Sequence, residues 1–111
     1  MIVRTYDDKT PEGYYVYNVE KDELAHITDI YPWLDENNMA TMNCVTYTSR
    51  DGLTIEGYLT LPKGYTMETA KNLPVVVNPH GGPWARDSWG FNPGVQFLAN
   101  RGYAVCQMNF R

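Results

Sequence analysis

A histidine and two glycines follow a run of three valines in the stretch PVVVNPHGGP, residues 74–83. Two consecutive glycines, Gly81 and Gly82, allow the main chain to approach a ligand closely and to turn its N–H groups outward. Such N–H groups can hold an anion, or the oxyanion that develops on a carbonyl oxygen during acyl transfer. The alternative is a tight turn that needs glycine only for its backbone angles.

Acyl transfer by a serine hydrolase also requires a nucleophile, a base and an orienting acid, with the serine on a G-x-S-x-G turn. The sequence has no G-x-S-x-G, and its only serines are Ser49 and Ser88. A triad of Ser88 and Asp87 with His26 or His80 is disfavoured, because adjacent side chains do not naturally point at one base. We therefore expect the chain to lack a complete triad.

The remaining residue types that could bind a metal are sparse. Cys44 and Cys106 lie far apart, and two buried free thiols are favoured over a disulfide, a nucleophile or a metal site. His26 and His80 have no supporting ligand spacing, so we expect no metal and no cofactor. His26, in LAHIT, is expected to be a partly buried strand residue.

Composition narrows the possible partners. The 111 residues leave room for one domain at most, and 43% hydrophobic with 20% charged residues is typical of a globular protein. A net charge of −4 without a basic stripe disfavours nucleic-acid binding. We expect no membrane span, because no apolar segment approaches about 20 residues. The N-terminus has no apolar signal core, and the compartment, cytoplasmic or periplasmic, stays open.

The first half of the chain predicts antiparallel β-structure. Strands over 14–19 and 25–30 are expected to form a hairpin, followed by an irregular connection. A second hairpin is predicted for 44–48 and 53–61, around the Asp51-Gly52 turn. The polar stretch 65–72 is expected to be a short helix or a loop.

The second half predicts a βαβ unit and hence an α/β fold. The unbroken valines at 75–77 indicate an interior strand covered on both faces. A helix is expected to begin at Pro93 and to end before Gly102, which sits where a C-terminal cap belongs. A second buried strand is predicted over 103–108. In such folds function gathers in loops at the carboxyl ends of strands, where HGGP lies.

Four stretches in this order resemble serine peptidases of the prolyl oligopeptidase family: SRDGLTIEGYLTLP, VVVNPHGGPWARDSW, FLANRGYAV and MNFR. The resemblance is strongest to the bacterial branch of acylaminoacyl-peptidases and dipeptidyl-peptidase-like enzymes. It covers residues 44–111 well. Residues 14–30 resemble, more weakly, the closing strands of the β-propeller that precedes the catalytic domain in that family.

The resemblance implies a division of the chain. Residues 1–38 would be terminal β-propeller strands and a linker, and residues 39–111 the N-terminal part of an α/β-hydrolase sheet, truncated. The chain is therefore expected to be a fragment of a peptidase. That parent would hydrolyse short peptides by acyl transfer, with aminoacyl or dipeptidyl release.

The resemblance also implies roles for the glycine-rich loop. The N–H of Gly82 would be one oxyanion donor, and the residue after the nucleophilic serine would supply the other. Gly81 would be needed for the turn. His80 stands where other branches carry a tyrosine that stabilises the oxyanion; we assign it to loop shaping, with a direct role left open. In this family the triad lies beyond Arg111, so we expect the chain alone to be inactive.

A non-enzymatic, aromatic-rich β interaction module is the alternative reading. Its support is a set of aromatic residues: Tyr14, Tyr15, Tyr17, Trp33, Trp84 and Trp89. In either case the strand over 103–110 is expected to leave an open sheet edge, and such edges recruit other strands. We therefore expect self-association of the chain.

Overall fold

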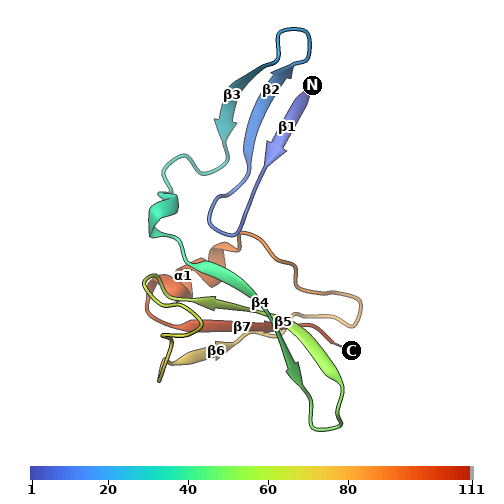
Figure 1. The fold of residues 1–111 in the computed structure, drawn as a ribbon. Coiled ribbons are helices and arrows are strands. Elements are labelled where there is room, and N and C mark those ends of the chain that lie inside the picture. The colour runs from blue at the N-terminus through green and yellow to red at the C-terminus, as the bar shows by residue number, and fades with distance from the viewer. Residues whose placement is uncertain (111) are drawn as a thin grey trace.

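The computed structural model describes residues 1–110, which form two β-sheets and one α-helix (Figure 1). The first sheet contains β1 (Ile2–Thr5), β2 (Gly13–Asn18) and β3 (Glu23–Asp29). The second contains β4 (Thr41–Thr48), β5 (Thr54–Leu61), β6 (Val75–Val77) and β7 (Ala104–Met108). A short 3-10 helix, η1 (Glu36–Asn38), connects the sheets, and α1 (Pro93–Asn100) lies between β6 and β7 in the chain.

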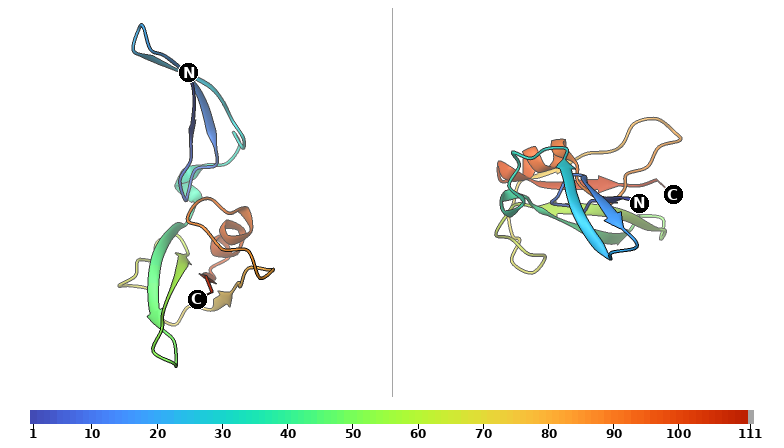
Figure 2. Two further views of the ribbon diagram at one scale, coloured as in Figure 1. Left: turned by 90° about the vertical axis from the view of Figure 1, so that its right-hand side faces the viewer. Right: turned by 90° about the horizontal axis from the view of Figure 1, so that it is seen from above.

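The two sheets lie end to end in an elongated molecule of 56 × 30 × 25 Å (Figures 1 and 2). In the first sheet the strands pair antiparallel in chain order. In the second the order is β4-β5-β7-β6, with only the β6–β7 pair parallel. One antiparallel sheet, one mixed sheet and a single α-helix agree with the coarse fold prediction. No helix within residues 1–110 is long and apolar enough to cross a membrane.

The predicted N-terminal hairpin is present as β2 and β3. The sequence pattern missed β1, which pairs with the other side of β2. Its four residues are too few to establish an alternating pattern. The N-terminal ammonium of Met1 donates a hydrogen bond to the Tyr17 carbonyl (2.9 Å) and so holds this strand in register.

The predicted second hairpin is also confirmed, as β4 and β5. At its turn Gly52 adopts a φ of +86°, a conformation that glycine reaches without steric cost. The Gly52 N–H donates to the Ser49 carbonyl (2.9 Å) and closes the turn. The stretch 65–72 contains turns and neither helix nor strand, so the loop alternative is the right one.

The βαβ elements are confirmed as β6, α1 and β7. The Asn92 side chain caps α1 by accepting from the Val95 N–H (3.1 Å), and Pro93 opens the helix, where its missing N–H costs nothing. Gly102, at φ +90°, follows the last turn as expected. Helix α1 packs against β5 and β7. The buried apolar residues are Ala40, Met42, Ile55, Leu61, Val95, Ala99, Ala104 and Val105.

The predicted positions of β6 and β7 in the sheet are wrong. β7 was expected at an open edge, but it lies between β5 and β6. β6 was expected in the interior, but it pairs only with β7, and Val75 and Val77 are 55% and 57% exposed. A run of β-branched residues indicates that a strand can be buried on both faces and says nothing about which neighbours are present. On this side of the sheet the open edge is therefore β6 and not β7.

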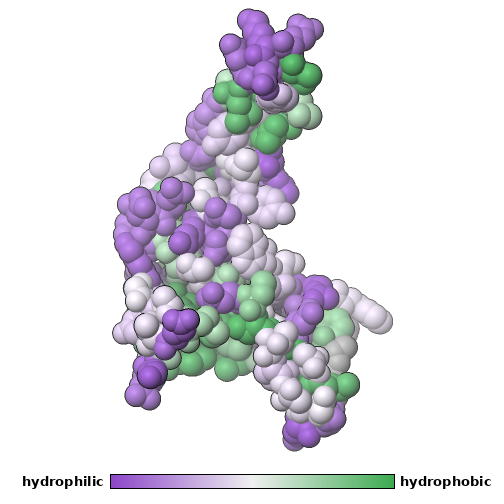
Figure 3. All heavy atoms as spheres, in the orientation of Figure 1, coloured by the Kyte–Doolittle hydropathy of each residue, from purple (hydrophilic) through white to green (hydrophobic). Residues whose placement is uncertain are grey.

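Both cysteines are free, as expected, but the expected burial is wrong. Cys44 is exposed and Cys106 is only half-buried. Cys44 lies on β4, which forms the other edge of the second sheet, so strand pairing covers it from one side only. Figure 3 shows further hydrophobic residues on the surface of both sheets.

A buried glutamine joins the two halves of the molecule. Gln96 of α1 is 7% exposed, and its Nε2 donates to the carbonyls of Asp8 (2.8 Å) and Ala40 (2.9 Å). Its Oε1 accepts from the Ala40 N–H (2.8 Å). The Asp8 carboxylate in turn accepts from the Met42 N–H (2.7 Å). The β1–β2 loop, the start of β4 and α1 are thereby held together.

Candidate functional site

The glycine-rich loop, residues 78–83, leaves β6 at the edge of the sheet where β7 also ends. Parallel strands place their carboxyl ends on the same side, so the loop meets the residues that follow β7. The Asn78 N–H donates to the Cys106 carbonyl (2.8 Å) and extends the pairing by one residue. The His80 ring then packs edge-on against Phe110, with ring centroids 5.5 Å apart.

Gly82 presents a free main-chain donor. Its φ of +70° lies in the left-handed region that favours glycine. Apart from the adjoining residues of the chain, no heavy atom within residues 1–110 lies within 4 Å of the position a Cβ would take at Gly81 or Gly82, so the loop is open to solvent. Within residues 1–110 no acceptor takes a hydrogen bond from the Gly82 N–H. The Nδ1 of His80 lies 3.2 Å from the carbonyl oxygen of the next residue, Gly81, in the exposed part of the loop.

The segment after the loop is anchored to the end of β7. The Asp87 N–H donates to Asn109 Oδ1 (2.7 Å), and Asn109 Nδ2 donates to the Asp87 carbonyl (3.2 Å). The Trp89 indole N–H donates to the Met42 carbonyl (3.0 Å). Between these anchors and β6 the chain projects outward, and Trp84 is 96% exposed. The loop is therefore fixed at both ends while its centre faces solvent.

The residues of the disfavoured triad are not brought together. His26 is exposed, where partial burial was expected, and its Nε2 lies 2.9 Å from Asp29 Oδ1. The Ser49 hydroxyl donates to the Asp51 carboxylate (2.6 Å). Across the described residues 1–110 no hydrogen bond joins Ser88 to a histidine. In the same range no group of three or more histidine, cysteine or acidic side chains could hold a metal ion.

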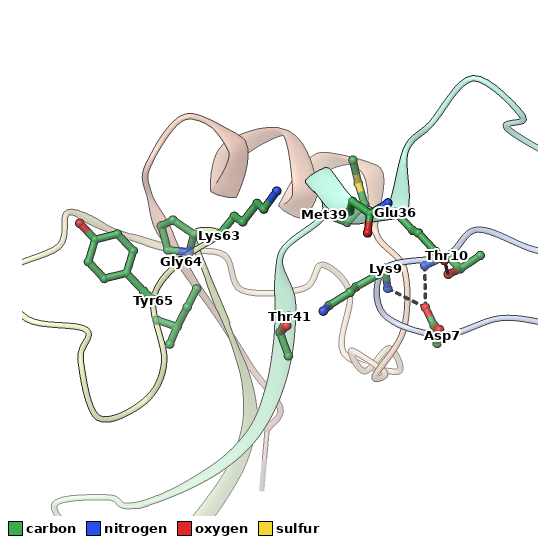
Figure 4. A pocket seen from close by; sticks show the side chains of 12 residues that line it. Asp7, Lys9, Thr10, Glu36, Met39, Thr41, Lys63, Gly64 and Tyr65 are labelled. Atoms are coloured by element: carbon green, nitrogen blue, oxygen red, sulfur yellow. Dashed lines mark hydrogen bonds between the residues drawn. The ribbon is translucent and has the colours of Figure 1, made fainter.

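A cavity of about 440 Å³ lies at the end of the second sheet that is opposite to the glycine-rich loop (Figure 4). Its lining comes from the β1–β2 loop, η1, the start of β4 and the residues at and after the carboxyl end of β5. It contains no histidine, cysteine or serine among its lining residues. Burial raises the pKa of the Asp7 carboxyl, but hydrogen bonds from the Thr10 and Lys9 N–H groups outweigh it and lower the pKa overall. The Thr10 hydroxyl donates to Glu36 (3.1 Å). These contacts order the β1–β2 loop.

Sequence reasoning found the glycine-rich loop but missed its anchors. Asp87, Gln107 and Asn109 are polar residues whose partners lie about twenty positions away in the chain. Gln107 and Asn109 are 2% and 4% exposed, which is unusual for amides. The only signal for these anchors in the sequence was that polar residues occur within and directly after the otherwise apolar strand β7.

Comparisons with known proteins indicate the family to which the chain belongs. The chain is 38% identical to dipeptidyl aminopeptidase BIII of Pseudoxanthomonas mexicana over 97% of this chain and 18% of that protein. It is 36% identical to dipeptidyl peptidase family member 6 of Caenorhabditis elegans, over 91% of this chain and 16% of that protein. The chain thus spans less than a fifth of the length of these relatives. No protein-family model matches it.

Solved structures agree with these relatives. Pyrococcus horikoshii acylaminoacyl peptidase superposes with a TM-score of 0.63 at 25% identity, over 97% of this chain and 17% of that one. The similarity extends over both sheets, since it covers nearly the whole chain. The chain therefore belongs to the prolyl oligopeptidase family of peptidases.

Proposed function

We propose that these 111 residues are the part of a serine peptidase that supplies one main-chain donor of the oxyanion hole. The peptidase would release aminoacyl or dipeptidyl units from short peptides by acyl transfer. The observation that carries the proposal is the Gly82 N–H, which is unpaired, lies at the carboxyl edge of a parallel strand pair and is held there by a positive φ. A donor fixed before the reaction costs no reorganisation when charge develops on the carbonyl oxygen.

The neighbouring residues take supporting roles in this proposal. Gly81 permits the turn, and His80 shapes the loop through its contacts with the Gly81 carbonyl and the Phe110 ring. A direct contact of His80 with the oxyanion remains part of the proposal. The second donor, the nucleophilic serine and its partners would come from residues after Arg111. Residues 1–38 would be propeller strands and linker, and residues 39–111 the start of the α/β-hydrolase domain.

The first test is turnover by the chain itself. We expect the 111-residue protein to leave aminoacyl and dipeptidyl chromogenic amides and esters intact, because no serine lies on a G-x-S-x-G turn. The rate should equal that of buffer. Turnover that co-purifies with the protein and survives further purification would show that a nucleophile lies within the chain.

The second test supplies the missing residues. In a hybrid, these 111 residues replace the matching segment of the Pseudoxanthomonas dipeptidyl aminopeptidase, which is 38% identical to them. A folded hybrid should hydrolyse a dipeptidyl chromogenic amide. A hybrid in which residues 79–83 are replaced by a glycine-free loop of equal length serves as control and should be inactive. Equal activity of both hybrids would contradict a role for the loop.

Exposed aromatic residues favour the alternative of an interaction module. Trp33 and Trp84 are 75% and 96% exposed. Trp33 packs edge-on against Tyr31 near η1, whereas Trp84 lies in the loop after β6, so they belong to different parts of the fold. A partner that binds both should lose affinity on replacement of either by alanine. A hybrid that is active, and that loses its activity when Gly82 is changed, would favour the peptidase function over the interaction module.

We further propose that the chain self-associates through the β6 edge. Unpaired N–H and C=O groups with exposed valines recruit another strand. Light scattering at micromolar concentration should give a mass above that of the monomer. Val77→Lys, which places a charge on this edge, should shift the protein to monomer, whereas the equally exposed loop variant Met67→Lys should not. A monomeric wild-type chain would contradict the proposal.

A further inference from the structure

Asn109, the residue directly after β7, holds the main chain that follows the glycine-rich loop. Its Oδ1 accepts from the Asp87 N–H (2.7 Å), and its Nδ2 donates to the Asp87 carbonyl (3.2 Å). One side-chain amide thus bonds both main-chain groups of a single residue, as the opposite residue of an antiparallel strand would. The segment between β6 and α1 is fastened in this way where it passes the carboxyl end of β7 (Figure 1).

Asn109 is itself held in place by the sheet. Its N–H donates to the Glu56 carbonyl (3.1 Å), which extends the pairing of β7 with β5 by one residue. Gln107, two residues earlier and so on the same side of the strand, donates to Asp87 Oδ1 (2.9 Å). Asn109 is buried, and both polar atoms of its amide are bonded. A buried amide that is fully bonded makes a contact with one defined geometry.

The two attachments of the loop lie close together on the same strand. At the first, the Asn78 N–H donates to the Cys106 carbonyl (2.8 Å) of β7. At the second, Asp87 bonds the side chain of Asn109, three positions further along. Residues 79–86 therefore leave β7 and return to it. The first attachment continues the ordinary pairing of β6, whereas the second depends on one side chain.

Gly82 lies near the middle of this loop, where little else fixes the main chain. Among residues 1–110 no hydrogen bond between main-chain groups involves residues 79–86. Pro83 follows Gly82 directly, and Pro79 precedes it by three residues. Proline fixes its own φ, so both links between Gly82 and the attachments contain a stiff residue. The direction of the Gly82 N–H thus depends on where the two ends of the loop are held.

We propose that Asn109 is a positioning residue for the Gly82 N–H, an inference that rests on the proposed peptidase function. Its side chain acts through the main chain of Asp87 and does not touch the substrate. It sets the place where the loop returns to the sheet, and with it the direction of the oxyanion donor. Without this attachment the loop gains other conformations, and the donor must be ordered again while charge develops on the substrate oxygen.

The first test measures the order of the Gly82 N–H in the 111-residue chain and does not depend on the hybrid. We expect an NMR order parameter of about 0.8 in the wild-type chain and below about 0.6 in Asn109→Ala. The Gly64 N–H, in a turn after β5, serves as the internal reference and should not change. An order parameter at Gly82 that is low in both proteins, or high in both, would overturn the inference.

The second test measures kcat and KM in the active hybrid. Asn109→Ala should lower kcat about tenfold or more and leave KM within about twofold, because a misplaced donor affects the transition state most. Asn109→Asp keeps the size and the acceptor, loses the donor to the Asp87 carbonyl, and should lower kcat about threefold or more. Gln96→Ala, which removes another buried amide that bonds main-chain groups, is the control and should keep kcat within about threefold. Unchanged kcat in both Asn109 variants would contradict the inference.

The third test combines Asn109→Ala with glycolic acid at position 82, which replaces the Gly82 N–H by an ester oxygen. If Asn109 acts through that N–H, its replacement should lower kcat less than about threefold further once the donor is gone. Effects that multiply in full would mean that Asn109 acts by another route. A Gly82 ester that lowers kcat beside an Asn109→Ala that does not overturns this inference and keeps the proposed function. A Gly82 ester without effect overturns both.

Discussion

Replacing Gly57 with alanine should lower the free energy of unfolding by more than about 4 kcal/mol, the largest stability effect expected of any single methyl group in this chain. Gly57 lies in β5 and pairs with β4 on one side and β7 on the other. A Cβ there would stand 2.5 Å from the Gln107 carbonyl oxygen. That oxygen belongs to the main chain of β7, so it cannot swing away as a flexible side chain would. The strands would have to separate.

Chemical denaturation followed by circular dichroism measures this loss. Gly64→Ala is the matched control, since Gly64 has a φ of +90° and open space around its Cβ position. It should cost only the roughly 1–2 kcal/mol of a left-handed alanine. If Gly57→Ala were no more destabilising than Gly64→Ala, β5 and β7 would not be as close as described.

Replacing Gln96 with alanine should cost about 3–5 kcal/mol, because it removes the side chain that satisfies three buried main-chain groups. The Ala40 N–H, the Ala40 carbonyl and the Asp8 carbonyl would each lose their partner. No other residue of α1 reaches the β1–β2 loop by a side-chain hydrogen bond within residues 1–110. The first sheet should therefore loosen from the second as well as unfold more easily.

Two measurements separate these effects. Denaturation gives the overall loss, and hydrogen exchange at the Met42 amide, which donates to Asp8, reports the contact between the sheets. Asn100→Ala, on the exposed end of the same helix, should change stability by less than about 0.5 kcal/mol. Unchanged exchange at Met42 in Gln96→Ala would show that Gln96 does not couple the sheets.

The local elements of this fold were predictable because their signals lie within a few residues. Asp51-Gly52 marks a hairpin turn, and Gly52 indeed has a positive φ. Pro93 and Gly102 bracket α1 because proline fits the first helical turn and glycine the position after the last. Such residues restrict the backbone directly, whatever the rest of the chain does.

The arrangement of strands was not predictable in the same way. The valines of β6 fit a buried strand, but their exposure depends on whether another strand pairs with them. Burial is thus a property of the neighbours, and composition alone indicated only that burial was possible. The four residues of β1 carried no pattern and gained their strand conformation from β2.

The candidate site was predictable in its loop and not in its supports. Gly81 and Gly82 are recognisable because two consecutive glycines after a strand indicate a backbone that turns tightly or approaches a ligand closely. The anchors are hydrogen bonds between residues far apart in the chain: 22 positions for Asp87 and Asn109, and 20 for Asp87 and Gln107. Their residue types are common on surfaces, so nothing in the sequence separates them from solvated amides.

The central claim is that the Gly82 N–H stabilises an oxyanion, and replacing that N–H by an ester oxygen tests it most directly. In the active hybrid described above, glycolic acid at position 82 removes the donor and leaves the side chains unchanged. We predict a fall in kcat of about 10²–10³-fold with little change in KM. The same replacement at Gly64, also at positive φ and exposed, should leave kcat unchanged. A Gly82 ester that keeps kcat within about threefold of the hybrid would contradict the claim.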